Sequence, residues 1–469
     1  MVGFIVYDLV IFAAFILVVI VLLRKNKKKV SRQGIAFLYK TDWGIKRMDS
    51  FARKREKLLK FSLPFVLISG FTLMALILIF LGESVYIYLK FPIVDVIRAP
   101  PLAPLIPYLP NLFGLQSFFP PLYFTYFIFA VGLGGILHEF AHGVYARLHK
   151  FKVKSTGFLF FGPIPGAFVE PDEKQMAKSE KVKQLSVLGA GTFANLIIAL
   201  IFAGVLWIFF LSTMNATGVG FAAYPQTVVN TSDIVIPDEA NLSSDLVEIE
   251  VNGEIFLTNP QALQTSIDNE IPQSIVFENG GAVRARLQGA IMEIDGEKVT
   301  NREDLSRVLS EKESGKQVVI KTAVRDGLFD TEPEFKSFDV TLGEREGATY
   351  LGVGFNSGNG GLSVPSRFLS FVLFSGAGTL NPEIYYESSL GSFGWFIYFL
   401  LWWTFFINLL LALFNMLPLG PLDGGRFLQY GVESVTKSEK AGRKILKIST
   451  WIILAGLLAM MAKWAVSFL

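Results

Sequence analysis

Six long apolar runs divide the chain, and each is long enough to cross a bilayer. A helix that spans a membrane needs about 20 predominantly apolar residues, and it satisfies its own backbone hydrogen bonds in lipid. The pattern therefore predicts a polytopic α-helical membrane protein with about six spans. These lie at about residues 4–23, 63–82, 122–148, 185–211, 394–418 and 448–468.

Residues 215–355 follow a different pattern, in which short apolar runs alternate with polar residues and glycine turns. This predicts a soluble insert of mixed strands and helices. Two segments inside it, 246–263 and 290–305, look alike. Each predicts a strand, an Asn-Gly or Asp-Gly turn, a short strand and a helix that begins at Thr-Asn. The similarity indicates a duplicated module, and it also fits two unrelated turns with common turn chemistry.

Two other segments are apolar but too broken for a regular helix. Residues 92–121 contain eight prolines, which predicts a loop that lies on the outer membrane interface. Residues 157–171 combine glycines and prolines with large apolar side chains, which is too apolar for a free loop.

The charges predict an orientation. Residues 24–60 hold 14 Lys and Arg and only three acids, which predicts a solvated basic loop. Basic loops stay in the cytoplasm, so we expect the N-terminus and the soluble insert outside. The other inner segments, 149–184 and 426–447, are also basic. The first apolar run lacks a basic start and a small-residue cleavage site, which favours a retained anchor over a signal peptide.

Composition narrows the function. The chain is 52% hydrophobic and 18% charged, against about 25% charged in ordinary soluble domains. Its net charge of +3 gives no basis for nucleic-acid binding. It has no cysteine, which excludes a thiol nucleophile, a disulfide framework and a cysteine zinc site.

The strongest chemical signal is the sequence His138-Glu139-x-x-His142 inside the third apolar run. Residues i and i+4 share one helix face, so two imidazoles can bind one Zn²⁺ and Glu139 can act as a general base. Ionisable groups inside a span are costly and are usually functional. The alternative is a pair of interfacial histidines with a snorkelling acid.

A catalytic zinc site normally has three protein ligands. His149 lies about two turns beyond His142 in a straight helix, so we interpret it as an interfacial side chain. Asp423 follows the fifth span at a similar depth and is the best third ligand; the alternative is an N-cap on the next helix. We interpret Asp8 and Glu83 as interfacial residues at the wrong depth.

These residues together resemble the site-2 protease family of intramembrane zinc metalloproteases. The resemblance rests on His-Glu-x-x-His at 138–142 and on Asn-x-x-Pro-x-x-x-Leu-Asp-Gly at 415–424. Gly191-x-x-x-Asn195 is similar to a smaller family motif, and 157–171 is similar to the family's membrane-re-entrant β-hairpin. The resemblance covers most of residues 120–430.

The resemblance implies a mechanism. His138, His142 and Asp423 would hold one Zn²⁺, and Glu139 would activate the attacking water and pass a proton to the leaving amine. Asn415 would bind the substrate backbone or the developing oxyanion. Asn195 would orient substrate, although an Asn at a membrane helix interface is often a packing contact.

Residues 283–345 look like a PDZ domain, with a first strand at 283–287, a strand and turn at 290–296 and a helix at 301–311. The stretch 224–277 is either a second PDZ-like unit or an insertion. A PDZ domain implies a peptide or protein ligand. The predicted divisions of the chain are an N-terminal membrane extension at 1–120, the membrane core at 121–214 and 356–430, the PDZ-like insert at 215–355, and a cytoplasmic helix with the final span at 431–469.

The expected substrates are membrane proteins with a transmembrane helix, cleaved in regulated proteolysis in a prokaryotic cell membrane. Two other functions compete with this one. A metal transporter would carry polar groups along a pathway, whereas here they converge on one place. A silent PDZ adaptor would be favoured by loss of Glu139, which is present.

Overall fold

The computed structural model describes two compact units, each of which we consider by itself. The first holds residues up to 212, Thr379 and those from 396 onward, and the second holds most of those in between. The described residues are 4–34, 36–42, 44–91, 100–101, 105–108, 119–162, 164–237, 246–325, 327, 329–345, 347–355, 379–381 and 383–467. Most of the proline-rich segment at 92–121 therefore lies outside them.

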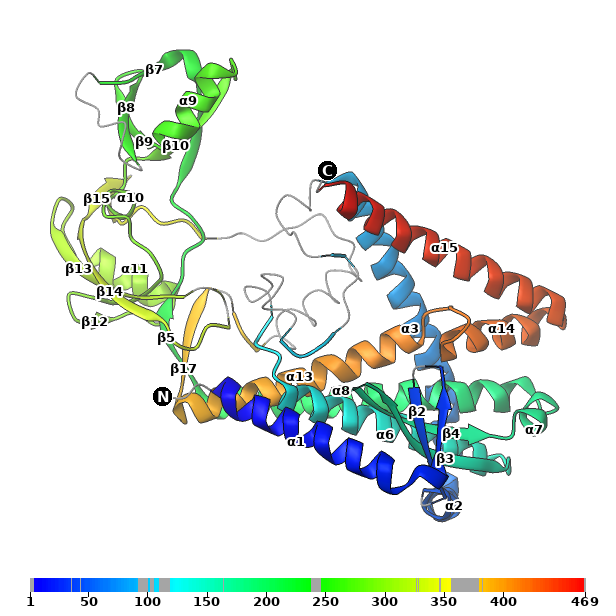
Figure 1. Ribbon diagram of the computed structural model, residues 1–469. Helices are drawn as coiled ribbons and strands as arrows, with labels where there is room; N and C mark the ends of the chain where they lie inside the picture. Colours follow the sequence, from blue (N-terminus) through cyan, green and yellow to red (C-terminus); the bar gives the residue numbers. More distant parts are fainter. Residues whose placement is uncertain are drawn as a thin grey trace. The chain divides into compact units, whose positions relative to one another are not determined.

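Long apolar helices dominate the first unit (Figure 1). Six helices among the described residues are long and apolar enough to cross a membrane, which confirms the six predicted runs. Many of their large apolar side chains are exposed, as expected of surfaces that face lipid. These helices are α1 (Phe4–Lys25), α3 (Glu56–Lys90), α6 (Phe124–Leu148), α8 (Lys181–Thr213), α13 (Gly391–Asn415) and α15 (Glu439–Val466).

A four-stranded antiparallel sheet lies beside α6 (Figure 1). Its strands are β1 (Val30–Gln33), β2 (Ala36–Thr41), β3 (Val153–Phe161) and β4 (Ile164–Pro171), in that order. The broken apolar segment at 157–171 is thus a β-hairpin, as the resemblance implied. The shorter helices of this unit are η1 (Lys27–Lys29), α2 (Ile45–Lys54), α7 (Glu173–Ala177) and α14 (Asp423–Thr436).

The prediction of a solvated basic loop at 24–60 is wrong. This segment contains β1, β2 and α2, and β2 pairs with β3 from Phe37 opposite Phe160 to Thr41 opposite Thr156. Met48 and Ala52 of α2 are buried in the same cluster as Val144 and Tyr145 of α6. The many lysines and arginines of this segment concealed a few apolar residues, such as Met48 and Ala52, that pack against the core.

Asp8 also differs from its interpretation as an interfacial residue. Its carboxylate is fully buried and accepts the backbone N–H groups of Phe124 and Thr125 at 2.6 and 2.9 Å. It also accepts the hydroxyls of Thr125 and Tyr108, both at 2.5 Å. The first N–H groups of a helix have no partner within the helix. Asp8 of α1 therefore caps the helix that carries the two histidines.

The second unit contains three antiparallel sheets. A five-stranded sheet has the order β6-β10-β9-β8-β7, a second has the order β14-β13-β11-β5-β17 with β12 on β11, and β15 pairs with β16. The elements are β5 (Met214–Val219), β6 (Gln226–Asn230), η3 (Thr231–Asp233), β7 (Ile234–Val235), β8 (Val247–Val251), β9 (Glu254–Thr258), α9 (Pro260–Asp268), β10 (Gln273–Glu278), α10 (Gly281–Arg284), β11 (Ala290–Ile294), β12 (Glu297–Lys298), α11 (Arg302–Ser310), β13 (Gln317–Val324), β14 (Glu334–Thr341), β15 (Gly343–Arg345), β16 (Ala348–Tyr350) and β17 (Ile384–Ser388).

The local predictions in this unit hold where turn and cap chemistry set them. Both look-alike segments form a strand, a turn, a strand and a helix, and the side chains of Asn259 and Asn301 cap α9 and α11. The predicted first strand at 283–287 is wrong, because α10 covers its first two residues and a tight turn follows. The two segments lie in different sheets, so whether they arose by duplication stays open.

Candidate metal centre

Three side chains on α6 form the basis of the site. His138, Glu139 and His142 offer ligand atoms that all lie within 4.8 Å of one another. Both histidines are buried, at 6% and 8% exposure, in a helix whose other titratable residues between Phe124 and His142 are Tyr126 and Glu139. The helical spacing alone brings the two imidazoles to the same face.

Asp423 joins this group from the first turn of α14. Its Oδ2 lies 3.2 Å from Nε2 of His138 and 3.2 Å from Nε2 of His142, while the two Nε2 atoms are 3.0 Å apart. The N-cap of α14 is Leu422, so Asp423 does not serve as the N-cap that was the alternative. The carboxylate instead faces the two histidines.

The chemistry of these three atoms fits a cation. Nδ1 of His142 lies 2.7 Å from the carbonyl oxygen of Val187, which can only accept, so Nδ1 carries the proton. Nε2 of a neutral His142 then presents a lone pair toward another acceptor, Asp423. Ligand atoms about 2.0–2.2 Å from a tetrahedral Zn²⁺ are about 3.3 Å from one another, close to the separations found.

Gly191 of α8 makes this arrangement possible. A Cβ atom at Gly191 would lie 2.5 Å from Nε2 of both His138 and His142. Any other residue would displace the two ligands. The glycine of the Gly191-x-x-x-Asn195 motif is therefore explained by a close approach of α8 to the site.

Asn195 lies one turn further along α8 and contacts the outer nitrogen of His138. The side-chain amide is fully buried, and its Nδ2 is 3.0 Å from Nδ1 of His138, while Oδ1 has no partner among the described residues. If Nε2 of His138 binds the metal, Nδ1 carries the proton. A flip of the Asn195 side-chain amide then places Oδ1 where it accepts the hydrogen bond from Nδ1. Partners of this kind fix the tautomer of a metal-bound histidine.

Glu139 points to the sheet. Its Oε2 accepts the backbone N–H of Val169 at 2.9 Å, and Val169 lies on β4, the edge strand of the four-stranded sheet. The carboxylate is thus held beside the two histidines by a strand far from it in sequence. The sequence could not predict this contact, because a backbone N–H group is common to nearly all residue types and so leaves no pattern in the sequence.

A comparison with known protein families decides the family. The model of peptidase family M50 matches residues 126–346 and 382–460, which is more than half of the chain. The chain belongs to peptidase family M50. M50 peptidases are zinc metalloproteases, so the His138, Glu139 and His142 group fits the metal that the family uses. The matched residues include all of α6 from Tyr126 onward, and α14.

A curated relative of this M50 chain is an uncharacterized protein from Methanocaldococcus jannaschii, 25% identical over 289 residues. The alignment covers 61% of this chain and 52% of that protein, so the chain spans about half the length of the curated relative.

Two other polar residues considered in the sequence, Asn415 and His149, are not among these ligand atoms. Asn415 is the last residue of α13, and its side chain makes no hydrogen bond to a described residue, so its role stays a prediction. His149 follows α6, and its Nε2 lies 2.8 Å from Oγ of Ser186. Burial, with Lys183 nearby, lowers the pKa of His149 to about 4.

Sequence reasoning missed one buried polar residue, Asn408 of α13. It is fully buried and donates to the carbonyl oxygen of Thr404 at 2.8 Å, while its Oδ1 has no partner among the described residues. A polar side chain in the middle of an apolar span is costly and therefore marks a position worth considering. The sequence analysis considered the motif at 415–424 and not Asn408.

Proposed function

We propose that this M50 peptidase is an intramembrane zinc metalloprotease of the site-2 type, which cuts transmembrane segments of membrane proteins. One observation carries the proposal. Two histidine nitrogens and a carboxylate oxygen converge within 3.0–3.2 Å on an apolar helix, beside the carboxylate of Glu139. Three ligands and a neighbouring base are what a catalytic zinc site requires.

His138, His142 and Asp423 would hold the ion, which supplies a Lewis acid that polarises the scissile carbonyl and makes water acidic enough to attack at neutral pH. Glu139 takes the proton of the attacking water and returns it to the leaving amine. The Val169 N–H holds one carboxylate oxygen of Glu139, so the other is free to do this. Asn415 would bind the substrate backbone or the oxyanion.

A substrate helix hides its carbonyl groups in its own hydrogen bonds, so cleavage requires local unwinding. β4 next to Glu139 is an edge strand among the described residues, which supports a way to hold the unwound segment. An extended chain can add to an exposed strand and leave its backbone in reach of the base. Asn195 orients His138 in this proposal and does not contact substrate.

We also propose the orientation given by the basic segments. The N-terminus and the β-rich insert would lie outside a prokaryotic cell membrane, with the site in the cytoplasmic half of the bilayer. The PDZ-like part of the insert would bind a peptide or protein ligand and gate access in regulated proteolysis. The strand, turn and helix at 290–310 support this part.

The test compares wild type with Glu139→Gln in detergent, measuring bound zinc and cleavage of a model transmembrane substrate. We expect about one zinc in both proteins and cleavage only by wild type. Wild type without zinc would refute the ligand set and favour a silent adaptor. Zinc that crosses a vesicle membrane without any cleavage would favour a transporter. Equal cutting by Glu139→Gln would assign the base elsewhere.

A further inference from the structure

A small apolar cavity lies against Glu139, between α6, α2 and the four-stranded sheet. Its volume is about 70 Å³. About 10–15 Å³ of such space holds one water-sized group, so the cavity holds about five non-hydrogen atoms, the size of a leucine or methionine side chain. Its walls come from Thr41, Gly44, Met48, Ile136, Glu139, Phe140, Thr156, Gly157, Phe158, Ala167, Phe168 and Val169.

Glu139 is the only ionisable group in that wall. The hydroxyl of Thr156 already has a partner, because it donates to the carbonyl oxygen of Thr41 at 2.9 Å. The cavity thus offers an apolar surface that ends at one carboxylate, and that carboxylate lies beside the metal-ligand atoms. Because Glu139 would act on the scissile bond, a substrate residue next to that bond can place its side chain in the cavity.

The N-terminal extension forms part of this wall. Gly44 and Met48 belong to α2 and its N-cap, and Thr41 ends β2, all outside the residues that match the family model. The docking of α2 is specific. A Cβ atom at Gly143 of α6 would lie 2.3 Å from Sδ of Met48, so the glycine makes a notch for that side chain.

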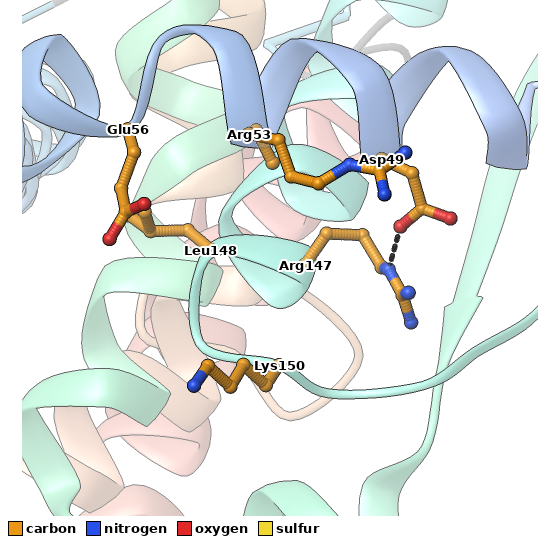
Figure 2. A pocket seen from close by; sticks show the side chains of 7 residues that line it. Asp49, Arg53, Glu56, Arg147, Leu148 and Lys150 are labelled. Atoms are coloured by element: carbon orange, nitrogen blue, oxygen red, sulfur yellow. Dashed lines mark hydrogen bonds and ion pairs between the residues drawn. The ribbon is translucent and has the colours of Figure 1, made fainter.

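A salt bridge holds the same two helices together. Figure 2 shows Arg147 at the end of α6 facing Asp49 of α2, and the two form an ion pair through Nε of the arginine. Phe51 and Phe140 also pack edge to face across the two helices, with ring centroids 5.9 Å apart. The wall that α2 supplies is therefore fixed in place.

We propose that this cavity binds a leucine- or methionine-sized side chain of the substrate next to the cut, and that α2 sets this preference. The inference rests on the proposed protease function and adds the substrate specificity. It assigns specificity to a part of the chain that the family core does not contain.

The first test changes the size of the cavity. Gly44→Val fills it, because a Cβ at Gly44 already lies 3.4 Å from the Met48 Cε and Thr156 Oγ1 atoms, and Met48→Ala enlarges it. Substrates carry Ala, Leu or Phe at each residue that flanks the mapped cut. An apolar pocket distinguishes such side chains by about 10–200-fold. We expect wild type to prefer Leu over Ala by about 10-fold or more in kcat/KM.

In Gly44→Val this ratio should fall to about 3-fold or less, and in Met48→Ala the substrate with Phe should gain. Gly82→Val on α3 is the matched control, because a Cβ at Gly82 meets nothing within 4 Å. Bound zinc is measured for each variant to show that the site is intact. Unchanged ratios in both cavity variants with zinc retained would overturn the proposal.

The second test does not depend on cleavage. The chain has no cysteine, so Gly44→Cys in the Glu139→Gln background gives a single thiol beside the cavity. We expect oxidation to link it to a cysteine at one position of a transmembrane substrate, next to the mapped cut, and Gly82→Cys to form no such link. A link without any cleavage by wild type would keep the cavity and refute the protease. Cleavage without the link would refute the cavity.

Discussion

Two aspartates of the unit with the membrane-type helices hold a carboxylate in apolar surroundings in opposite ways: Asp8 is fully buried, and the side chain of Asp423 is 24% exposed. Asp8 is surrounded by donors: two backbone N–H groups and two hydroxyls point at its oxygens. Asp423 instead lies 3.2 Å from Nε2 of His138 and of His142, and Nε2 of a neutral His142 presents a lone pair to it. A buried carboxylate needs partners for its charge. Asp8 finds them within the protein, whereas the atoms around Asp423 fit a bound cation.

The difference separates a structural acid from a ligand better than burial does. Asp8 is the more buried of the two, and burial alone would make it the stronger functional candidate. The identity of the partner atoms reverses that order. Asp8 caps the start of α6, and Asp423 of α14 faces His138, which also belongs to α6. Asp8 thus supports the helix of the site, and Asp423 is part of the site itself.

The sharpest separation should come from Asp423→Ala. Removing one of three ligands should lower zinc affinity by more than about 100-fold, beyond the 10–100-fold that outer partners cost, and should abolish cleavage. The folded protein should remain, because α14 keeps its helix without this side chain. Competition with a chelator and thermal unfolding measure the two effects. Retained zinc affinity would exclude Asp423 as a ligand.

Asp8→Ala should show the opposite pattern. It leaves the first N–H groups of α6 and two hydroxyls without their acceptor, and each buried unpaired group costs about 1–3 kcal/mol. We expect a loss of at least about 4 kcal/mol in unfolding free energy with zinc affinity nearly unchanged in the folded fraction. Asp8→Asn, which keeps two acceptor lone pairs, should recover part of the loss. A zinc defect at full stability would contradict this division of roles.

Asn195→Leu tests an effect of intermediate size. Loss of the contact to Nδ1 leaves the tautomer of His138 free, so zinc affinity should fall about 10–100-fold. Asn195→Asp, which accepts from the same N–H, should retain more affinity than the leucine variant. A purely packing role would instead make leucine, with its similar branched shape, the better replacement.

Sequence alone predicted the parts of this molecule that local spacing sets. His138 and His142 are one helical turn apart, and Asn259 and Asn301 precede helices they cap. Contacts between distant segments could not be predicted in the same way. Asp8 and Phe124 are 116 residues apart, and the pairing of β2 with β3 joins residues about 115 apart.

Two errors had physical causes of this kind. The strand predicted at 283–287 is the end of α10 followed by a tight turn, because the backbone N–H of Leu287 donates to the carbonyl oxygen of Ala282. β17 pairs with β5 across more than 160 residues, and its short sequence Ile384–Ser388 gave no strand signal of its own. Asp423 was predicted as the third ligand from its depth just past the fifth span, and the motif at 415–424 then agreed with it.

The smallest effect concerns His149, the histidine that lies outside the cluster. Its pKa is lowered to about 4 by burial, and the ordinary value is about 6.5. Below about pH 6.5 His149 becomes protonated in the unfolded chain, whereas in the folded protein it stays neutral down to about pH 4. Stability should therefore fall as the pH decreases through this window. His149→Gln, which can still donate to Ser186, should lose less stability over the same range.

The measurement is thermal unfolding between pH 7.5 and pH 4.5, with a chelator present throughout. The chelator removes zinc release from the comparison, because neither protein then holds the metal. The difference between wild type and His149→Gln isolates the one histidine. If both proteins lose the same stability, the folded protein protonates His149 as readily as the unfolded chain does. The lowered pKa of this histidine would then be refuted.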